Sequence, residues 1–224
     1  MPVIASGTFV RDVAAQAEFI KRLHGTGVGA VTVLVGMMAE PGEDDAVWQG
    51  RVERLLALTD PIPLALYECP APYHRLLTPE LVGWAGRTGR FHVLKETSRS
   101  AEAVCAKVAA AAGTPLGVFN ADATTLLPTL RAGARGYCGI AANFYPGLLA
   151  RLCADAGEAA AEDWQAFLTL VDPLVHRDYP VSAKVFQGIA GVAMLPTSRV
   201  SDATLTPYDL RVLGALATQI AAIG

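Results

Sequence analysis

Short apolar segments alternate with longer amphipathic segments along most of the chain. Six apolar runs have the length of a strand and are bounded by small or polar residues. Several of them are apolar at nearly every position, which is typical of parallel strands that are covered on both faces. The pattern therefore predicts an α/β fold with six βα units, whose strands are Val3–Ser6, Ala30–Val35, Ile62–Tyr67, Phe91–Lys95, Leu116–Phe119 and Gly136–Ile140.

The segments between these runs carry apolar residues at helical spacing. Thr78 followed by Pro79 is typical of the first turn of a helix, and Pro128 is expected to kink the fifth helix. The predicted helices of the βα units are Asp12–His24, Glu43–Leu58, a helix from Thr78, Ser100–Ala112, Asp122–Ala132 and Phe144–Ala156.

The strand signals stop after Gly157, and three helices are predicted in the tail, at Glu158–His176, Ser182–Met194 and Thr206–Ile223. We therefore expect a βα array over residues 1–156 and a helical extension over residues 157–224. Six units are two fewer than a closed TIM barrel contains, whereas an open doubly wound sheet would tolerate six. The glycines of Gly25–Gly29 precede a strand instead of following one, which argues against a nucleotide-binding loop.

Composition narrows the classes of function. The 224 residues are 52% hydrophobic and carry a formal charge of -3, which is typical of a globular protein and offers no basic surface to nucleic acid or anionic lipid. The apolar stretch Val28–Ala39 is too short to cross a bilayer and no signal peptide is visible, so a cytoplasmic protein without membrane attachment is expected. The four cysteines and four histidines lack the spacing of metal ligands; no metal is expected, and the cysteines are predicted to be reduced thiols in the core.

Two polar residues end consecutive predicted strands, Tyr67 and Lys95. Barrel enzymes keep their reactive residues at this end of the strands. Strand alternation predicts that Lys95 shares a face with Phe91 and Val93. An amine there could attack a carbonyl carbon, and the phenol could move protons. From spacing alone, a solvated lysine paired with Glu96 and a half-buried tyrosine at the rim remain open alternatives.

The sequence around both residues resembles a known family. Tyr67-Glu68-Cys69-Pro70 is similar to the Tyr-Asn-x-Pro motif, and Leu94-Lys95-Glu96-Thr97-Ser98 to the Lys-Glu-x-Ser/Thr motif, of the dihydrodipicolinate synthase and N-acetylneuraminate lyase family. The resemblance extends in the same order over nearly the whole chain, with further similar stretches at residues 2–8, 120–122, 136–143 and 184–207.

This resemblance implies a TIM barrel with C-terminal helices and class I aldolase-type chemistry on pyruvate or a related 2-keto acid and an aldehyde. By position, Lys95 would form the Schiff base and Tyr67 would relay protons, with no metal or organic cofactor. The family is usually oligomeric, so a homo-oligomer is expected. The residues predicted to bind substrate are Ser6, Thr8, Ala121 and Cys138. For Ser6 and Thr8, hydrogen bonding within the loop remains an open alternative.

Three departures from the family pattern matter. Residues 1–8 align with the family's third strand, so its first two βα units and its Gly-x-Thr/Ser-Thr/Ser-Gly carboxylate-binding segment are unmatched. Met37 and Met38 replace a Tyr-Tyr pair. Pro72 replaces an arginine, and the nearby Arg75 is expected to be a solvated loop charge. These changes favour an aldehyde less charged or larger than aspartate semialdehyde. The alternative function is a truncated, inactive family remnant that associates with itself or with a full-length paralogue.

Overall fold

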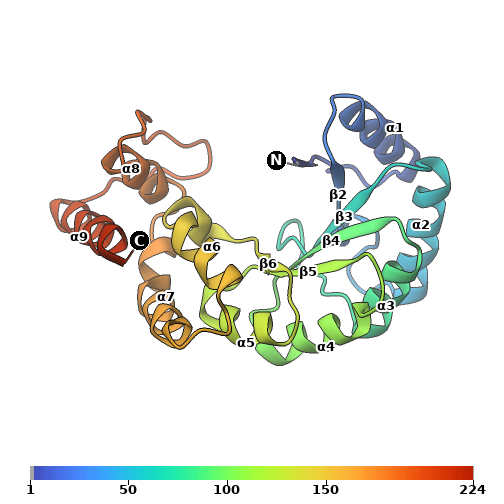
Figure 1. Cartoon of the computed structure of the whole chain (residues 1–224). Coiled ribbons are helices and arrows are strands. Elements are labelled where there is room, and N and C mark those ends of the chain that lie inside the picture. The colour runs from blue at the N-terminus through green and yellow to red at the C-terminus, as the bar shows by residue number, and fades with distance from the viewer. Residues whose placement is uncertain (1–2, 224) are drawn as a thin grey trace. The chain divides into compact units, whose positions relative to one another are not determined.

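The protein has an α/β fold of the TIM-barrel type, with six βα units as a partial barrel and further helices after them. The computed structural model describes residues 3–223. The strands follow one another in chain order (Figure 1), which confirms the predicted class. They are β1 (Ile4–Ser6), β2 (Ala30–Leu34), β3 (Leu64–Tyr67), β4 (Phe91–Glu96), β5 (Gly117–Asn120) and β6 (Gly136–Tyr137).

Contacts between residues divide the chain into two compact units. The first runs up to Asn120 and includes Ala132–Arg135, and the second contains Ala121–Arg131 and the residues from Gly136 onward. We predicted a boundary after residue 156 because the βα pattern of the sequence ends there. The two units are defined by contacts between residues and do not test that boundary, so it stays a prediction.

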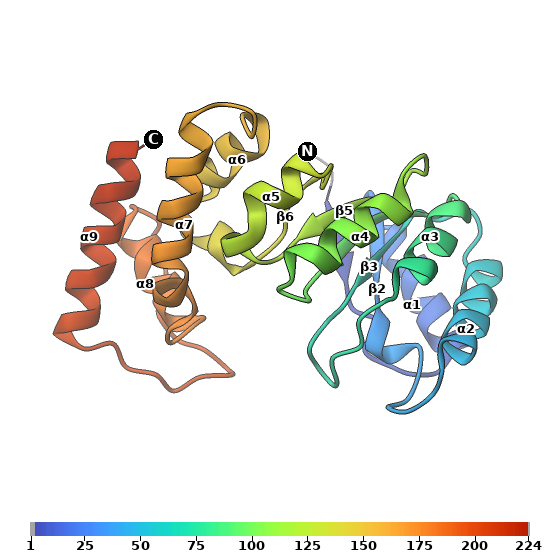
Figure 2. The same ribbon diagram turned by 90° about the horizontal axis from the view of Figure 1, so that it is seen from below.

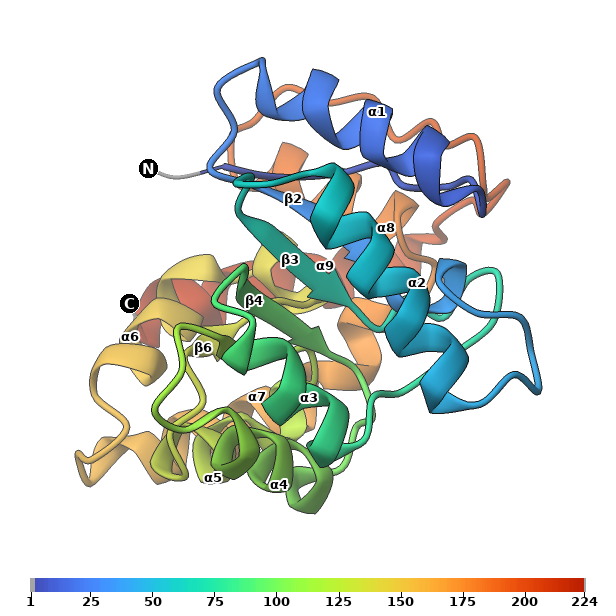
Figure 3. The ribbon, with the colours of Figure 1, turned by 90° about the vertical axis from the view of Figure 1, so that its right-hand side faces the viewer.

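In the first unit, helices cover one face of the parallel strands (Figure 3). Each α-helix of this unit begins where the sequence offers a capping side chain: the Asp12 carboxylate, for example, accepts a hydrogen bond from the Ala15 amide at 2.7 Å. Fully buried apolar side chains such as Ile20 and Trp48 fill the space between the helices and the strands. The helical elements of this unit are α1 (Val13–His24), the short 3-10 helix η1 (Val35–Met37), α2 (Asp45–Leu58), α3 (Pro79–Arg87) and α4 (Ala101–Ala111).

The register of the strands sorts their side chains into two sets. Val33, Leu66, Leu94 and Val118 lie side by side and are buried in the core beneath the helices. The next residue of each strand points to the opposite face because side chains alternate along a strand. The following row is therefore Leu34, Tyr67, Lys95 and Phe119, at the carboxyl ends of β2 to β5.

The second unit holds β6 and the remaining helices (Figure 2). Its core contains Leu126, Phe144, Leu168 and Phe186. These elements are η2 (Ala123–Thr125), α5 (Leu126–Arg131), η3 (Ile140–Asn143), α6 (Pro146–Ala154), α7 (Ala160–His176), α8 (Val181–Ile189) and α9 (Pro207–Ile223).

Two helix predictions in this unit need correction. The predicted fifth helix is split into η2 and α5. Pro128 is the third residue of α5, a position whose N–H has no partner within the helix, so the proline removes no helical hydrogen bond. The predicted helix to Met194 ends at Ile189, and the backbone turns at Gly191, whose φ is 92°. Apolar residues beyond that turn continue the pattern without continuing the helix.

The four cysteines are free thiols, but none is fully buried in the core as predicted, although Cys153 packs against the core of the second unit. Cys138 is exposed, and Cys69, Cys105 and Cys153 are half-buried. Within residues 3–223, no helix has the length and apolar character needed to span a bilayer.

Candidate active site

Tyr67 and Lys95 are brought together at the ends of neighbouring strands. They are register partners on β3 and β4, and both are half-buried. The Lys95 Nζ atom lies 4.2 Å from the centroid of the Tyr67 ring, which is cation–π distance. We call these residues the tyrosine–lysine pair.

The face that carries Lys95 differs in one respect from the prediction. Pairing shifts by one residue along β4, so that Phe91 lies opposite Leu64 while Val93 lies opposite Ala65. Because of this bulge, Phe91 joins the core beneath the helices and does not share the face of Lys95. Val93 does share that face.

The four lysines of the chain have different surroundings. Lys21 pairs with Glu18 at 2.8 Å, Lys107 is bound by two carboxylates, and Lys184 donates to the Thr197 carbonyl. Among residues 3–223, the interaction found for the Lys95 ammonium is the one with the Tyr67 ring. Lys95 is therefore the amine that can be reached without breaking a bond to oxygen.

Glu96 pairs with Lys107 and not with Lys95, so the alternative of a Lys95–Glu96 pair is wrong. Lys107 Nζ lies 2.7 Å from Glu96 Oε1 and 2.7 Å from Glu68 Oε1. All three side chains are buried, and we call them the buried triad (Glu68, Lys107 and Glu96). Burial raises the pKa of the Glu68 carboxyl, although Lys107 and the Leu77 amide act in the opposite direction.

Sequence reasoning missed the buried triad, although one signal for it exists. On α4, the buried positions are Val104, Lys107 and Ala111, which is the spacing of a helical core stripe. A lysine in such a stripe needs buried carboxylates as partners. The two glutamates that directly follow Tyr67 and Lys95 were the candidates.

The predicted substrate residues of the first unit differ in their surroundings. Thr8 is buried, and its hydroxyl donates to the Thr32 carbonyl at 3.2 Å and accepts from the Leu34 amide at 3.1 Å. This hydroxyl is therefore hydrogen-bonded to the backbone of β2, in agreement with the alternative that Thr8 forms hydrogen bonds within the protein. Ser6 is exposed at the end of β1. Substrate binding by either residue stays a prediction.

The other two predicted substrate residues lie near each other in the second unit. Gly139 directly follows Cys138, and a Cβ atom added there would overlap the Ala121 carbonyl oxygen. Cys138 is exposed, and Ala121 is half-buried. Their role in binding substrate stays a prediction.

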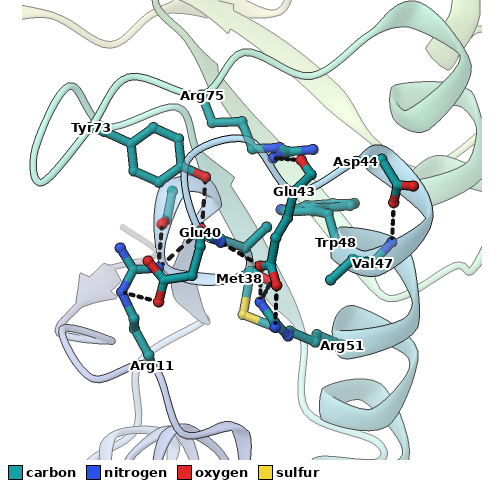
Figure 4. Close-up of polar contacts among 12 residues, drawn as sticks. Arg11, Met38, Glu40, Glu43, Asp44, Val47, Trp48, Arg51, Tyr73 and Arg75 are labelled. Atoms are coloured by element: carbon teal, nitrogen blue, oxygen red, sulfur yellow. Dashed lines mark hydrogen bonds and ion pairs between the residues drawn. The ribbon is translucent and has the colours of Figure 1, made fainter.

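Arg75 is not the solvated charge that we expected (Figure 4). Its side chain is only 11% exposed, and it donates to the Asp45 carboxylate at 2.7 Å and to the Glu43 carbonyl at 2.9 Å. Nearby, the Tyr73 hydroxyl donates to the Ala39 carbonyl at 2.7 Å. These bonds tie the loop after β3 to the loop after β2, so the Arg75 guanidinium is already occupied.

The same network holds the loop after β2 from its other side (Figure 4). Arg51 binds the Glu43 carboxylate through both terminal nitrogens, at 2.6 and 2.9 Å, and Arg11 pairs with Glu40 at 3.1 Å. Met37 and Met38, which replace the family's tyrosines, are buried. In this chain they fill the core.

No group of three or more His, Cys, Asp or Glu side chains that could hold a metal ion is found within residues 3–223.

The parallel βα array with helices on one face places the protein in the TIM-barrel class. The sequence model of the dihydrodipicolinate synthetase family matches residues 53–211. The chain belongs to this family. No protein of curated function is similar enough in sequence to be matched.

Solved structures give the same fold. One is YagE, a prophage protein of the dihydrodipicolinic acid synthase family from E. coli K12 in complex with pyruvate, with 19% identity over 99% of this chain and 76% of that chain and a TM-score of 0.79. Another is the dihydrodipicolinate synthase of Acinetobacter baumannii complexed with pyruvate, with 18% identity, coverage of 99% and 75%, and a TM-score of 0.80. The Thermotoga maritima synthase has 16% identity, coverage of 99% and 76%, and a TM-score of 0.80.

Proposed function

We propose that this protein is a lyase or aldolase that forms a Schiff base between Lys95 and pyruvate or a related 2-keto acid. The observation that carries the proposal is the Lys95 nitrogen, 4.2 Å from the ring centroid of Tyr67, while the three other lysines are held by oxygen atoms. Two relatives of the same fold were solved with pyruvate, which supports this substrate class.

In the proposed reaction the Lys95 amine adds to the ketone carbon, and water leaves as the C=N bond forms. The protonated imine withdraws electrons, so the neighbouring carbon can lose a proton and then form a bond to an aldehyde, or the reverse. The Tyr67 phenol donates a proton to the oxygen that leaves as water, and the resulting phenolate accepts the proton that the neighbouring carbon loses. The scheme uses no metal and no organic cofactor.

We propose that the aldehyde substrate has no carboxylate group that an arginine of the protein would have to bind. Pro72 stands where the family has such an arginine, and Arg75 is bound to Asp45 and to the loop after β2. A guanidinium whose N–H groups already donate to one carboxylate cannot form a bidentate pair of hydrogen bonds with the carboxylate of a substrate.

Trapping with borohydride tests the proposal directly. Reduction of the protein with pyruvate present should add one reduced pyruvate to the peptide that contains Lys95, as read by peptide mass mapping. The same treatment without pyruvate should add nothing. An adduct confined to Lys21 or Lys184, or no adduct at all, would refute the assignment.

Removal of the Tyr67 hydroxyl should slow the chemistry while keeping the ring. We expect Tyr67→Phe to trap pyruvate about 10²- to 10⁴-fold more slowly, because general acid–base catalysis contributes about that much. The trapping rate under single-turnover conditions measures it. Tyr73→Phe is the matched control, since its hydroxyl serves a loop carbonyl, and it should trap at the wild-type rate. Equal rates in both variants would remove Tyr67 from the relay.

One observation favours association with a second copy of the chain, as an additional or alternative function. β1 pairs with β2 on one side, and within residues 3–223 no strand pairs with its other edge. Phe9 is 71% exposed, and Ile4 in the strand and Val3 and Val10 near it are exposed as well. An apolar edge strand of this kind favours pairing with another chain.

Measuring the molecular mass of the protein in solution tests whether the unpaired edge of β1 binds a second copy of the chain. We expect the wild type to be a homo-oligomer in light scattering after size exclusion, and Phe9→Glu to shift it toward the monomer because a charge would be buried at the interface. Leu170→Glu, at an equally exposed apolar residue of α7, is the control and should leave the mass unchanged. A wild-type monomer would exclude this interface.

A further inference from the structure

The two strands of the candidate site end in the same way. In each strand, a residue of the tyrosine–lysine pair is followed directly by a glutamate, Tyr67 by Glu68 and Lys95 by Glu96. Because side chains alternate, the reactive groups point to one face and the two carboxylates to the other. The Glu68 amide donates to the Lys95 carbonyl at 3.3 Å, which continues the pairing of the strands past Tyr67.

Lys107 of α4 joins the two carboxylates. Its Nζ atom is 2.7 Å from an oxygen of each, and exposure is 0% for Glu68, 0% for Glu96 and 3% for Lys107. With so little access to water, the Lys107 ammonium depends on the two carboxylates, and each carboxylate depends on Lys107, for stabilisation of its charge. The three side chains thus have one favourable arrangement.

Backbone groups next to the site complete this arrangement. Glu68 accepts from the Leu77 amide at 2.8 Å and from the Thr97 amide at 3.1 Å, and Glu96 accepts from the Ser98 amide at 3.1 Å. The segment after Lys95 is therefore bonded to the side chain that follows Tyr67.

A further chain of bonds leads to the loop after β3. The Thr97 hydroxyl donates to the Glu68 carbonyl at 2.6 Å, which uses its single proton. The contact of 2.8 Å between Thr97 Oγ1 and His74 Nε2 must then be donated by the histidine. The ends of β3 and β4 are joined by side chains as well as by the ladder.

We propose that the buried triad is the positioning device of the site: Glu68, Lys107 and Glu96 fix the ends of β3 and β4 in one register, and so hold Lys95 against the Tyr67 ring. The proposal rests on the proposed function for its catalytic consequence. A one-residue slip of either strand would move its reactive group to the helix face and its carboxylate away from Lys107. The buried charges make that slip unfavourable.

The test uses a readout that does not depend on activity. The Tyr67 ring should shift the resonance of the Lys95 ε-methylene group, which can be followed in protein labelled at its four lysines. Lys95→Arg identifies the signal. In Glu68→Gln, the amide keeps an oxygen for Lys107 but turns an NH₂ toward the Thr97 amide, so the link to β4 is broken. Loss of most of the ring-induced shift is expected in Glu68→Gln and in Lys107→Met.

A matched control separates positioning from general loss of stability. Val52→Ala removes fully buried volume on α2 and should lower the melting temperature while keeping the Lys95 shift. At a temperature where all variants are folded, pyruvate trapping should fall about 10²-fold in Glu68→Gln, as misplacement of a reacting group predicts, and stay unchanged in Val52→Ala. If Lys107→Met does not fold, Glu68→Gln and Glu96→Gln decide the question.

The outcomes distinguish this inference from the proposed function. A shift that persists in every folded triad variant overturns the positioning role, whether or not the wild type traps pyruvate. A wild type that never traps pyruvate, but loses the shift when the triad is changed, refutes the proposed function and supports the positioning role.

Discussion

The Lys95→Ala variant should form no reducible adduct with pyruvate. The proposed reaction needs an amine at this position, and the methyl group of alanine cannot form a C=N bond. We expect the trapping rate to fall on the order of 10⁴-fold or more, as when a covalent nucleophile is removed from an enzyme. Time courses of borohydride-trapped adduct, read by intact mass, give the ratio to wild type.

The variant should remain folded, so the loss can be assigned to chemistry. Lys95 is half-buried, and its described interaction is the cation–π contact with Tyr67, which contributes about 0.5–2 kcal/mol. Circular dichroism and the melting temperature check this. Lys21→Ala, which removes an exposed lysine paired with Glu18, should trap at the wild-type rate. Full trapping by folded Lys95→Ala would disprove the proposed function.

The strands were predictable because their segments are short, mostly apolar and bounded by small or polar residues, and β2 is buried at all five of its positions. Each observed strand lies within or next to its predicted apolar run, as β2 (Ala30–Leu34) does within Ala30–Val35. Helix ends were less predictable where apolar residues continue beyond the helix, as they do after Ile189. Their spacing cannot show that the backbone turns at Gly191.

The meeting of Tyr67 and Lys95 followed from topology alone, since carboxyl ends of consecutive parallel strands are adjacent. The face of the sheet to which Phe91 points could not be predicted. A bulge in β4 changes the alternation of side chains between the two faces without changing the apolar pattern of the sequence. The surroundings of Arg75 depend on how two loops meet. Sequence spacing carries no information about such a contact.

Lys107→Met should destabilise the folded protein more than any of the other substitutions. The change keeps much of the side-chain volume but leaves Glu68 and Glu96 buried without a cation. Breaking a buried ion pair by removing one partner costs about 3–5 kcal/mol, and here two carboxylates lose the same partner. We expect the free energy of unfolding, measured by urea denaturation near neutral pH, to fall by about that amount.

Lys21→Met is the matched control, because the exposed pair of Lys21 with Glu18 contributes only about 0–1 kcal/mol. Equal stability of the two variants would mean that the buried carboxylates are solvated or protonated at little cost. Replacing the whole triad by apolar residues should restore stability only in part. The amides of Leu77, Thr97 and Ser98 would lose their carboxylate acceptors, and an unsatisfied buried donor costs about 1–3 kcal/mol. The triad thus differs from a simple buried ion pair, because it also supplies the hydrogen bonds that end two strands.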